Sequence, residues 1–231
     1  MYGFSLWITG GNTSAAAKNH LLDVGVDKAG GTSYTAIISN IVCGQSGAAV
    51  DGGIRFYFPF FITAGSTIAV RIQGSNGTAG TVRVASTFYG RPNRPEAIRT
   101  GCFSETIGTI TNSNGVSFTP GNTAAEGSWV SLGTTVKAMW WWQLGVQIDN
   151  GTTTSLMYHI DLAYGGVTNK HMIIENLPLY LPGTAERTCF AGLLDGQNYC
   201  EVPEGATLYV RGSCSGTAVT GFNAVAIGVG G

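Results

Sequence analysis

The chain has 231 residues, a formal net charge of −1 at pH 7, and only 11% charged residues. Because phosphate binding rests on clustered Lys and Arg, this balance argues against a nucleic-acid partner. No stretch approaches the roughly 18 consecutive apolar residues that a membrane-spanning helix needs, and Met1–Thr9 lacks the basic start of a secretory signal peptide. We therefore expect a globular protein that is made in the cytoplasm and has no membrane partner.

The low charge also bears on the surface of the protein. The sequence combines it with 35 glycines and many threonines and valines. Charged residues help to keep isolated monomers in solution, and the centres of subunit interfaces are depleted of them. We therefore expect neighbouring subunits to cover much of the surface, as in a homo-oligomer.

From the N-terminus onwards, the sequence predicts strands rather than helices. The best helical run, Ser14–Leu22, spans barely two turns and includes Asn19 and His20. Short segments rich in Val, Ile, Thr, Tyr and Phe recur instead at intervals of roughly ten residues, bounded by Gly, Asn, Asp and Pro, which is typical of a sandwich or barrel. The predicted strands are Thr35–Val42, Ile54–Ile62, Thr67–Gln73, Thr81–Tyr89, Leu156–Ala163, Met172–Leu181, Thr207–Arg211 and Phe222–Val229.

The alternation of apolar and polar residues is clearest in Thr67–Gln73. Ile68, Val70 and Ile72 fall at alternate positions, with Arg71 between them. Successive side chains of a strand point to opposite faces of the sheet. We therefore expect the three apolar residues to face a core and Arg71 to face away from it.

Two segments recur in the same order, which predicts an internal duplication. Leu22–Asp27 is similar to Trp142–Gln147, 120 positions later, and Ile62–Arg71 is similar to Val202–Arg211, 140 positions later. The greater spacing of the second match predicts an insertion near residues 183–200 of the second copy.

The duplication predicts an all-β fold of two tandem, related antiparallel β-sandwich domains. Prolines and charges mark Arg91–Glu96 as a linker. The first domain would then span residues 1–95, and residues 96–231 would hold the linker and the second domain. Within the second domain, Thr106–Thr119 is expected to form a hairpin that turns at Asn112–Gly115.

Five glycines are predicted to be structural turn residues. Hairpin turns need residues that tolerate a positive φ angle, and glycine does so at no steric cost. The candidates are Gly30, Gly31, Gly65, Gly151 and Gly205.

The cysteines do not indicate a metal site. None of the five forms a Cys-x-x-Cys pair, and no histidine lies at a zinc-site spacing, so we expect no metal and no cofactor. The odd number means that at least one thiol stays free or pairs between chains. Buried reduced thiols are one reading; local disulfides that join Cys189 to Cys200, or Cys200 to Cys214, are the other.

Catalytic motifs are absent from the sequence. His159 and Asp161 lie two apart on a predicted strand and could form an orienting pair, but no serine or cysteine nucleophile in an elbow or triad motif accompanies them. We therefore expect no catalytic residues and no enzymatic activity.

The run Trp140-Trp141-Trp142 is the most unusual feature. In a strand, Trp140 and Trp142 would point to one face and Trp141 to the other. Three interpretations remain open: a sandwich core with one ring over an edge, a subunit interface, where tryptophan is enriched, or a platform on which a sugar stacks.

Two blocks of the first half, Leu21–Tyr34 and Phe56–Ser66, resemble structural proteins of tailed bacteriophages. The resemblance covers roughly residues 20–90 and, through the repeat, the corresponding part of the second half. It implies a jelly-roll-like fold and a place in the virion, as a head decoration, a spike-base protein or a tail or baseplate component. It also implies contacts with further copies of the chain and with other virion proteins.

Two other functional classes remain as alternatives. A carbohydrate-binding module would use the tryptophan run, with a host-surface glycan as its partner. A small β-sandwich hydrolase would depend on His159 and Asp161.

Overall fold

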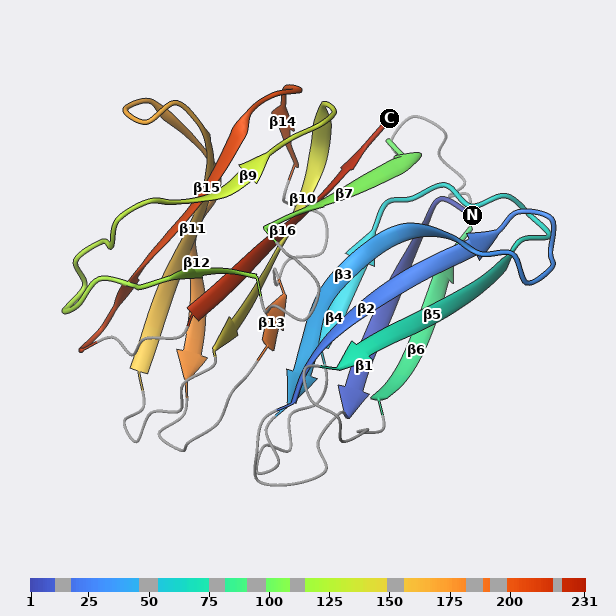
Figure 1. The fold of residues 1–231 in the computed structure, drawn as a ribbon, viewed down its shortest axis with the longest axis horizontal. Coiled ribbons are helices and arrows are strands. Elements are labelled where there is room, and N and C mark those ends of the chain that lie inside the picture. Colours follow the sequence, from blue (N-terminus) through green and yellow to red (C-terminus); the bar gives the residue numbers. More distant parts are fainter. Residues whose placement is uncertain are drawn as a thin grey trace.

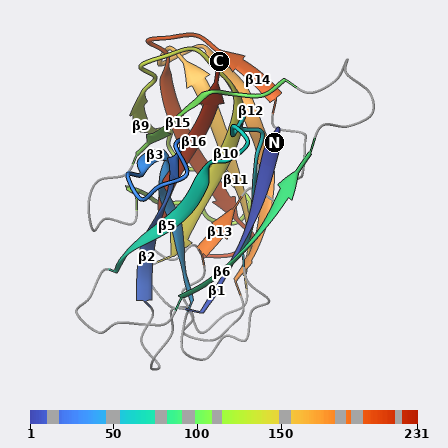
Figure 2. The ribbon, with the colours of Figure 1, turned by 90° about the vertical axis from the view of Figure 1, so that its right-hand side faces the viewer.

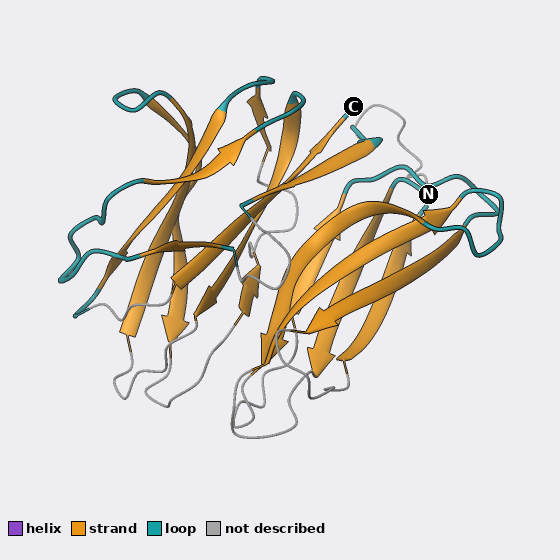
Figure 3. Ribbon diagram, in the orientation of Figure 1, coloured by secondary structure: helices purple, strands orange, loops and turns teal. Residues whose placement is uncertain are grey.

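The computed structural model describes residues 1–10, 18–45, 54–74, 82–90, 99–108, 115–148, 156–181, 189–191, 199–217 and 222–231. Figure 3 shows strands and loops but no helix in these residues, and hence none that could cross a membrane. Of the weak helical run Ser14–Leu22, the described residues Lys18–Leu22 belong to a strand. The strands are β1 (Gly3–Gly10), β2 (Lys18–Asp27), β3 (Thr35–Gln45), β4 (Ile54–Phe58), β5 (Thr67–Gly74), β6 (Val82–Tyr89), β7 (Phe103–Ile107), β8 (Val116–Phe118), β9 (Val130–Thr134), β10 (Met139–Ile148), β11 (Leu156–Gly165), β12 (Lys170–Leu181), β13 (Cys189–Ala191), β14 (Tyr199–Val202), β15 (Thr207–Cys214) and β16 (Phe222–Gly230).

The first half of the chain is a sandwich of two antiparallel sheets. One has the strand order β4–β1–β6 and the other has the order β3–β2–β5 (Figure 1). Alternate residues of β1, such as Phe4 and Leu6, pack with Phe58 of β4 and with Leu22 and Val24 of β2 in one buried cluster. This packing follows the period of two that an antiparallel sheet with one buried face requires.

The second half is a larger sandwich. Its sheets have the orders β12–β11–β15–β9 and β13–β10–β16–β7, with β14 also paired to β10. Trp142 and Leu144 of β10 pack between these sheets with Tyr158 of β11 and Phe222 of β16. The predicted all-β class with antiparallel sandwiches is confirmed.

Strands β7, β8 and β9 close one side of the second sandwich. Ile107 of β7 lies opposite Ala226 of β16, and Val116 of β8 lies opposite Ala224 of the same strand. The expected hairpin over Thr106–Thr119 is therefore wrong, because β7 and β8 follow one another along β16 instead of pairing with each other. β9 pairs with the outer edge of β15 in the facing sheet.

The central strands of the two halves carry the same polar arrangement. Asp23 on β2 lies opposite Arg71 on β5 and accepts a hydrogen bond of 2.8 Å from the backbone N–H of Asn40. The corresponding set on β11, β15 and β12 is Asp161, Arg211 and Asn176, and its bond from the Asn176 N–H is also 2.8 Å. Both asparagines have a positive φ, 58° and 53°, next to irregularities in the strand pairing.

These contacts decide which strands of the two halves correspond. β5 and β15 occupy equivalent places, as the match 140 positions apart predicts. The match of Leu22–Asp27 to Trp142–Gln147 is wrong as a structural correspondence. β2 lies between β3 and β5, and the strand in the same position of the second half, between β12 and β15, is β11 and not β10. The expected insertion near residues 183–200 lies largely outside the described residues.

The two halves share buried residues. Ile227 and Val229 of β16 belong to the same buried cluster as the core of the first sandwich. Strands β3 and β4 contact the second half, so that side of the first sandwich lies against it (Figure 1). The proposed boundary at residue 95 lies outside the described residues, and the division into domains stays a prediction.

Three of the turn glycines have a left-handed backbone. The φ angles are 77° at Gly30, 83° at Gly65 and 77° at Gly205. Gly31 has no positive φ, and glycine fits there for a steric reason: a Cβ would lie only 2.9 Å from an oxygen of the Asp27 carboxylate. Gly151 lies outside the described residues.

Candidate assembly surfaces

The tryptophan run lies at the joint between the two halves. All three rings are buried, with exposures of 2% for Trp140, 1% for Trp141 and 0% for Trp142. Trp142 packs in the second core, and its Nε1–H donates to the carbonyl of Cys200 at 3.0 Å. Trp140 and Trp141 instead belong to the cluster of the first half. The expectation that Trp140 and Trp142 point to the same face of the strand is therefore wrong. The pairing of β10 with β14 is irregular between Met139 and Trp141, so the simple alternation of side chains does not hold there.

Polar and aromatic contacts hold the joint together. The Trp141 ring meets Tyr57 edge to face, with centroids 5.7 Å apart. The side-chain amide of Gln143 donates to the carbonyl of Tyr57, and the hydroxyls of Ser104 and Thr106 donate to carbonyls of β3. In this arrangement the run joins two parts of one chain, and none of its rings is exposed for a sugar or a second subunit.

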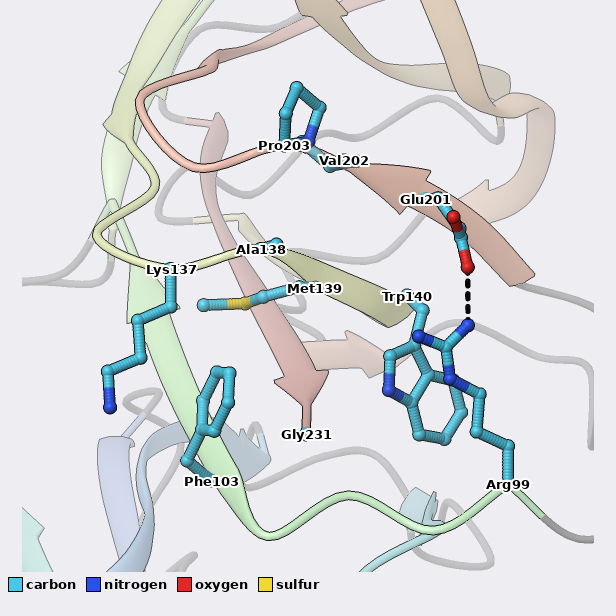
Figure 4. Close-up of a pocket in the computed structure, with 10 residues that line it drawn as sticks. All are labelled: Arg99, Phe103, Lys137, Ala138, Met139, Trp140, Glu201, Val202, Pro203 and Gly231. Carbon is cyan, nitrogen blue, oxygen red and sulfur yellow. Dashed lines mark hydrogen bonds and ion pairs between the residues drawn. The ribbon is translucent and has the colours of Figure 1, made fainter.

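A pocket of about 660 Å³ opens beside Trp140 (Figure 4). The Arg99 guanidinium lies 4.7 Å from the centre of the Trp140 ring and forms an ion pair with Glu201. Tyr199 stacks on the same indole at 5.4 Å, and its burial raises the pKa of its hydroxyl, an effect that Arg99 opposes. Among the described residues that line the pocket, Glu201 has the one acidic side chain, and it is paired with Arg99.

Of the candidate pair His159 and Asp161, the aspartate has a structural explanation. Asp161 is 2% exposed, and its carboxylate accepts from Arg211 Nε at 2.9 Å as well as from the Asn176 N–H. Arg211 in turn stacks on Trp129 at 4.4 Å. The carboxylate therefore stabilises an irregular strand pair. No group of three potential metal-ligating residues occurs in the described part of the chain.

The cysteines whose side chains are described are free thiols. Cys200 and Cys214 are both reduced, so neither expected local disulfide is present here. The side chain of Cys189 lies outside the described residues. Cys43 is buried, which raises the pKa of its thiol to about 12, whereas Cys102 is exposed.

The side of the first sandwich formed by β5 and β6 is open. Figure 2 shows these strands on the side that is remote from the second half. Val70 and Ile72 lie opposite core residues of β2, yet they are 42% and 38% exposed. Phe88 on β6 lies opposite the buried Phe4 and is 43% exposed. The predicted core face of Ile68, Val70 and Ile72 is thus only partly covered.

The equivalent side of the second sandwich is covered. Val210, at the place of Val70, is fully buried and pairs with Val130 of β9. At Gly212, which takes the place of Ile72, a Cβ would contact the Phe118 ring at 3.5 Å. In the second sandwich, β9 pairs with the edge of β15, and β7 and β8 pair with the edge of β16. Within the described residues, the first sandwich has no strands that pair in this way with β5 and β6, so these edges are available for binding.

Comparisons with known proteins identify no family. No protein-family model matches the sequence, and no curated protein is similar to it. Among solved structures, a chain from infectious bursal disease virus, Gx strain, has 10% identity and a TM-score of 0.32, with 99% of this chain and 56% of that chain covered. A chain from the empty top component of cowpea mosaic virus has 10% identity and a TM-score of 0.35, with coverages of 99% and 76%.

A chain of the T13 particle of infectious bursal disease virus has 13% identity and a TM-score of 0.31, with 99% of this chain and 54% of that chain covered. The protein thus spans about half the length of the bursal disease virus chains. At these identities and TM-scores, the similarities assign neither a fold family nor a function.

Proposed function

We propose that the protein is a non-enzymatic structural subunit of a bacteriophage virion, either a capsid decoration (cement) protein or a tail-associated component. It assembles with further copies of itself and with other virion proteins. The resemblance of Leu21–Tyr34 and Phe56–Ser66 to structural proteins of tailed phages supports the virion location. The observation that carries the assembly role is the open side of the first sandwich, with its exposed inner residues on β5 and β6.

Apolar side chains that face a sandwich core yet remain exposed are typical of surfaces that a partner covers. Val70, Ile72 and Phe88 fit this description. With a net charge of −1, the chain has little long-range repulsion to keep copies apart. Both properties favour assembly over existence as an isolated monomer.

The contacts of Asp161 support a non-enzymatic role. Asp161 is bound by Arg211 and by the Asn176 N–H, and the equivalent Asp23 is bound by Arg71 and the Asn40 N–H. A feature that recurs at the same structural place in both halves belongs to the fold. We further infer that the halves arose by duplication, on the same evidence.

The native mass of the chain in solution tests the assembly role. We expect light scattering to give a stable oligomer across a concentration series, both with and without reductant. A monomer at every concentration would contradict the proposal, and a glycan array would then test the carbohydrate-binding alternative. For the virion location, mass spectrometry should find the chain in purified particles of the phage that encodes it.

A further inference from the structure

Within the part of the chain that the structure describes, no strand pairs with the outer edge of β6. β6 is the outer strand of the sheet β4–β1–β6, extends over eight residues, and contains no proline and one charged residue, Arg83. Four consecutive residues, Ala85–Phe88, are exposed, so solvent reaches both faces of the strand. Natural proteins usually protect such edges with short strands, prolines or charges, since an open edge pairs readily with another chain.

Several other outer strands of the described residues have these protections. β9 is only five residues long, and β12 contains Pro178 together with the charged residues Lys170 and Glu175. β3 and β4 lie against the second half. β5, the outer strand of the facing sheet, is equally long and has no proline, but its one charged residue, Arg71, lies in the middle of the strand, whereas Arg83 lies near the start of β6. The long unprotected edges therefore lie on the β5–β6 side, and β6 is the one whose middle carries no charge.

The second half indicates how such an edge is occupied. The equivalent strand, β16, pairs along its outer edge with β7 and β8, and both pairings are antiparallel. An isologous contact between two copies of one strand around a two-fold axis perpendicular to the sheet is also antiparallel. A second copy of β6 thus offers the geometry that the sheet already uses in the other half.

We propose that two copies of the chain pair through β6, antiparallel around a two-fold axis, and so join their sheets into one continuous sheet of order β4–β1–β6–β6–β1–β4. This inference rests on the proposed function, because it names the partner and the strand through which assembly begins. The occupant is a second copy rather than a different protein.

The residues of β6 are compatible with self-pairing. Residues that lie opposite one another in an antiparallel pair point to the same face, so Val84 must lie opposite another inward-facing residue. Two registers near the middle of the strand satisfy this condition, one centred on Ala85 and one on Ser86. Arg83 then lies opposite Thr87 or Tyr89 and never opposite the second Arg83, so like charges do not meet.

An exposed tryptophan lies next to the proposed axis. Trp7 of β1 is directly opposite Ala85 and is 49% exposed. Tryptophan is enriched among the residues that contribute most to protein interfaces. In the register centred on Ala85, both copies place Trp7 beside the contact, which favours this register.

Cysteine cross-linking tests the pairing directly. In the full chain with Cys102→Ser, which removes the exposed thiol, Ala85→Cys and Ser86→Cys are each oxidised and analysed on non-reducing gels. Cβ atoms of directly opposite residues lie about 4.5–5.5 Å apart, near the range that a disulfide spans. We expect one of the two variants to form covalent dimers. Ser131→Cys, an exposed position on β9, is the matched control and should not form them.

A charge variant measures the strength of the contact. Ala85→Arg should raise the dissociation constant of the dimer at least about tenfold, because two arginines then meet near the axis. Ser131→Arg is the control and should leave the constant unchanged. The melting temperature of dilute, dissociated Ala85→Arg protein should equal that of the wild type, since Ala85 is exposed.

The outcomes separate this inference from the proposed function. An oligomer that neither cross-links at Ala85 or Ser86 nor responds to Ala85→Arg would overturn pairing through β6 and leave the assembly role intact. A wild-type chain that is monomeric at every concentration would contradict both. Dimers that cross-link at one of the two positions and dissociate with Ala85→Arg would support both.

Discussion

The two Asp–Arg–Asn sets allow a prediction in which the chain supplies its own control. Asp161→Ala removes a carboxylate that is 2% exposed and bonded to Arg211 and to the Asn176 N–H. Asp23→Ala removes the equivalent carboxylate, which is 17% exposed and paired with an Arg71 side chain that is 80% exposed. The chemistry of the two substitutions is the same, but the burial differs, and Arg211 also has Glu126 as a second acidic partner.

The expected losses of stability follow from this difference in burial. Removing one partner of a buried ion pair costs about 3–5 kcal/mol, because the other charge loses its partner in a poorly solvated place. Arg211 is 27% exposed and keeps Glu126 at 3.5 Å, which places the cost of Asp161→Ala near the lower end, about 3 kcal/mol. An exposed ion pair contributes about 0–1 kcal/mol and one backbone hydrogen bond about 1 kcal/mol, so Asp23→Ala should cost about 1–2 kcal/mol.

Thermal unfolding followed by circular dichroism measures both losses. For a chain of this size, 1 kcal/mol corresponds to roughly 2–4 °C in Tm, so Asp161→Ala should lower the Tm by about 6–12 °C and Asp23→Ala by about one third to two thirds as much. High salt should reduce the loss for Asp23→Ala more than for Asp161→Ala, since exposed charges are screened more strongly. Equal losses, or a larger loss at Asp23, would refute the reasoning from burial.

Three further predictions concern the turns, the joint and a buried thiol. Gly65→Val and Gly205→Val should each cost about 1–3 kcal/mol in thermal unfolding, because valine is strained at φ angles of 83° and 77°. Gly166→Val is the control, since this glycine has equally open space around it but no positive φ, and it should cost less. Trp141→Ala should cost about 3–5 kcal/mol in denaturant unfolding, and a loss below 1 kcal/mol would contradict its place in the joint. With its pKa raised from 9.0 to about 12, Cys43 stays protonated in the folded protein while the unfolded thiol ionises, so stability should fall between about pH 9 and pH 12. This fall should be smaller in Cys43→Ala, and native protein should react with a thiol reagent at Cys102 but not at Cys43.

Most strands could be predicted from the sequence because their evidence is local. The period of two in Thr67–Gln73 and the glycines at positions 65 and 205 depend only on neighbouring residues and on backbone sterics. The match between Ile62–Arg71 and Val202–Arg211 was also informative, because it includes the arginines that bind Asp23 and Asp161. These residues are constrained by the same contact in both halves.

The errors arise where pairing between distant segments decides the structure. The similarity of Leu22–Asp27 to Trp142–Gln147 reflects a pattern that many strands share, and it does not reveal which neighbours a strand has. The sequence also shows no sign of the irregular pairing of β10 with β14 near Met139 and Trp141, where two adjacent indoles join the same cluster. β7 and β8 resemble a hairpin in sequence, but β16 provides a longer edge on which both can pair.

The open edge of β6 was equally beyond sequence reasoning, since a strand becomes an edge only through the order of the sheet. Val82–Tyr89 has the composition of any half-buried strand, and the expectation of assembly came instead from the scarcity of charge. The structure shows where such a contact can form, at the outer edge of β6. It also adds Trp7, an exposed aromatic residue that the sequence analysis did not single out, because its exposure depends on the neighbours that β4 and β6 provide.

The coverage of the two sandwiches assigns different roles to the halves. The second sandwich has its β15 and β16 edges paired with β9, β7 and β8, and it also covers the side of the first that holds β3 and β4. Among the described strands, those on the β5–β6 side of the first sandwich then remain with long unprotected edges. Substitutions in the second core should therefore lower Tm and assembly together, because assembly requires the folded chain. Substitutions at exposed positions of β6 should change assembly and leave the Tm of the monomer unchanged. Separate effects on Tm and on assembly are what we expect if β6 serves as the contact strand.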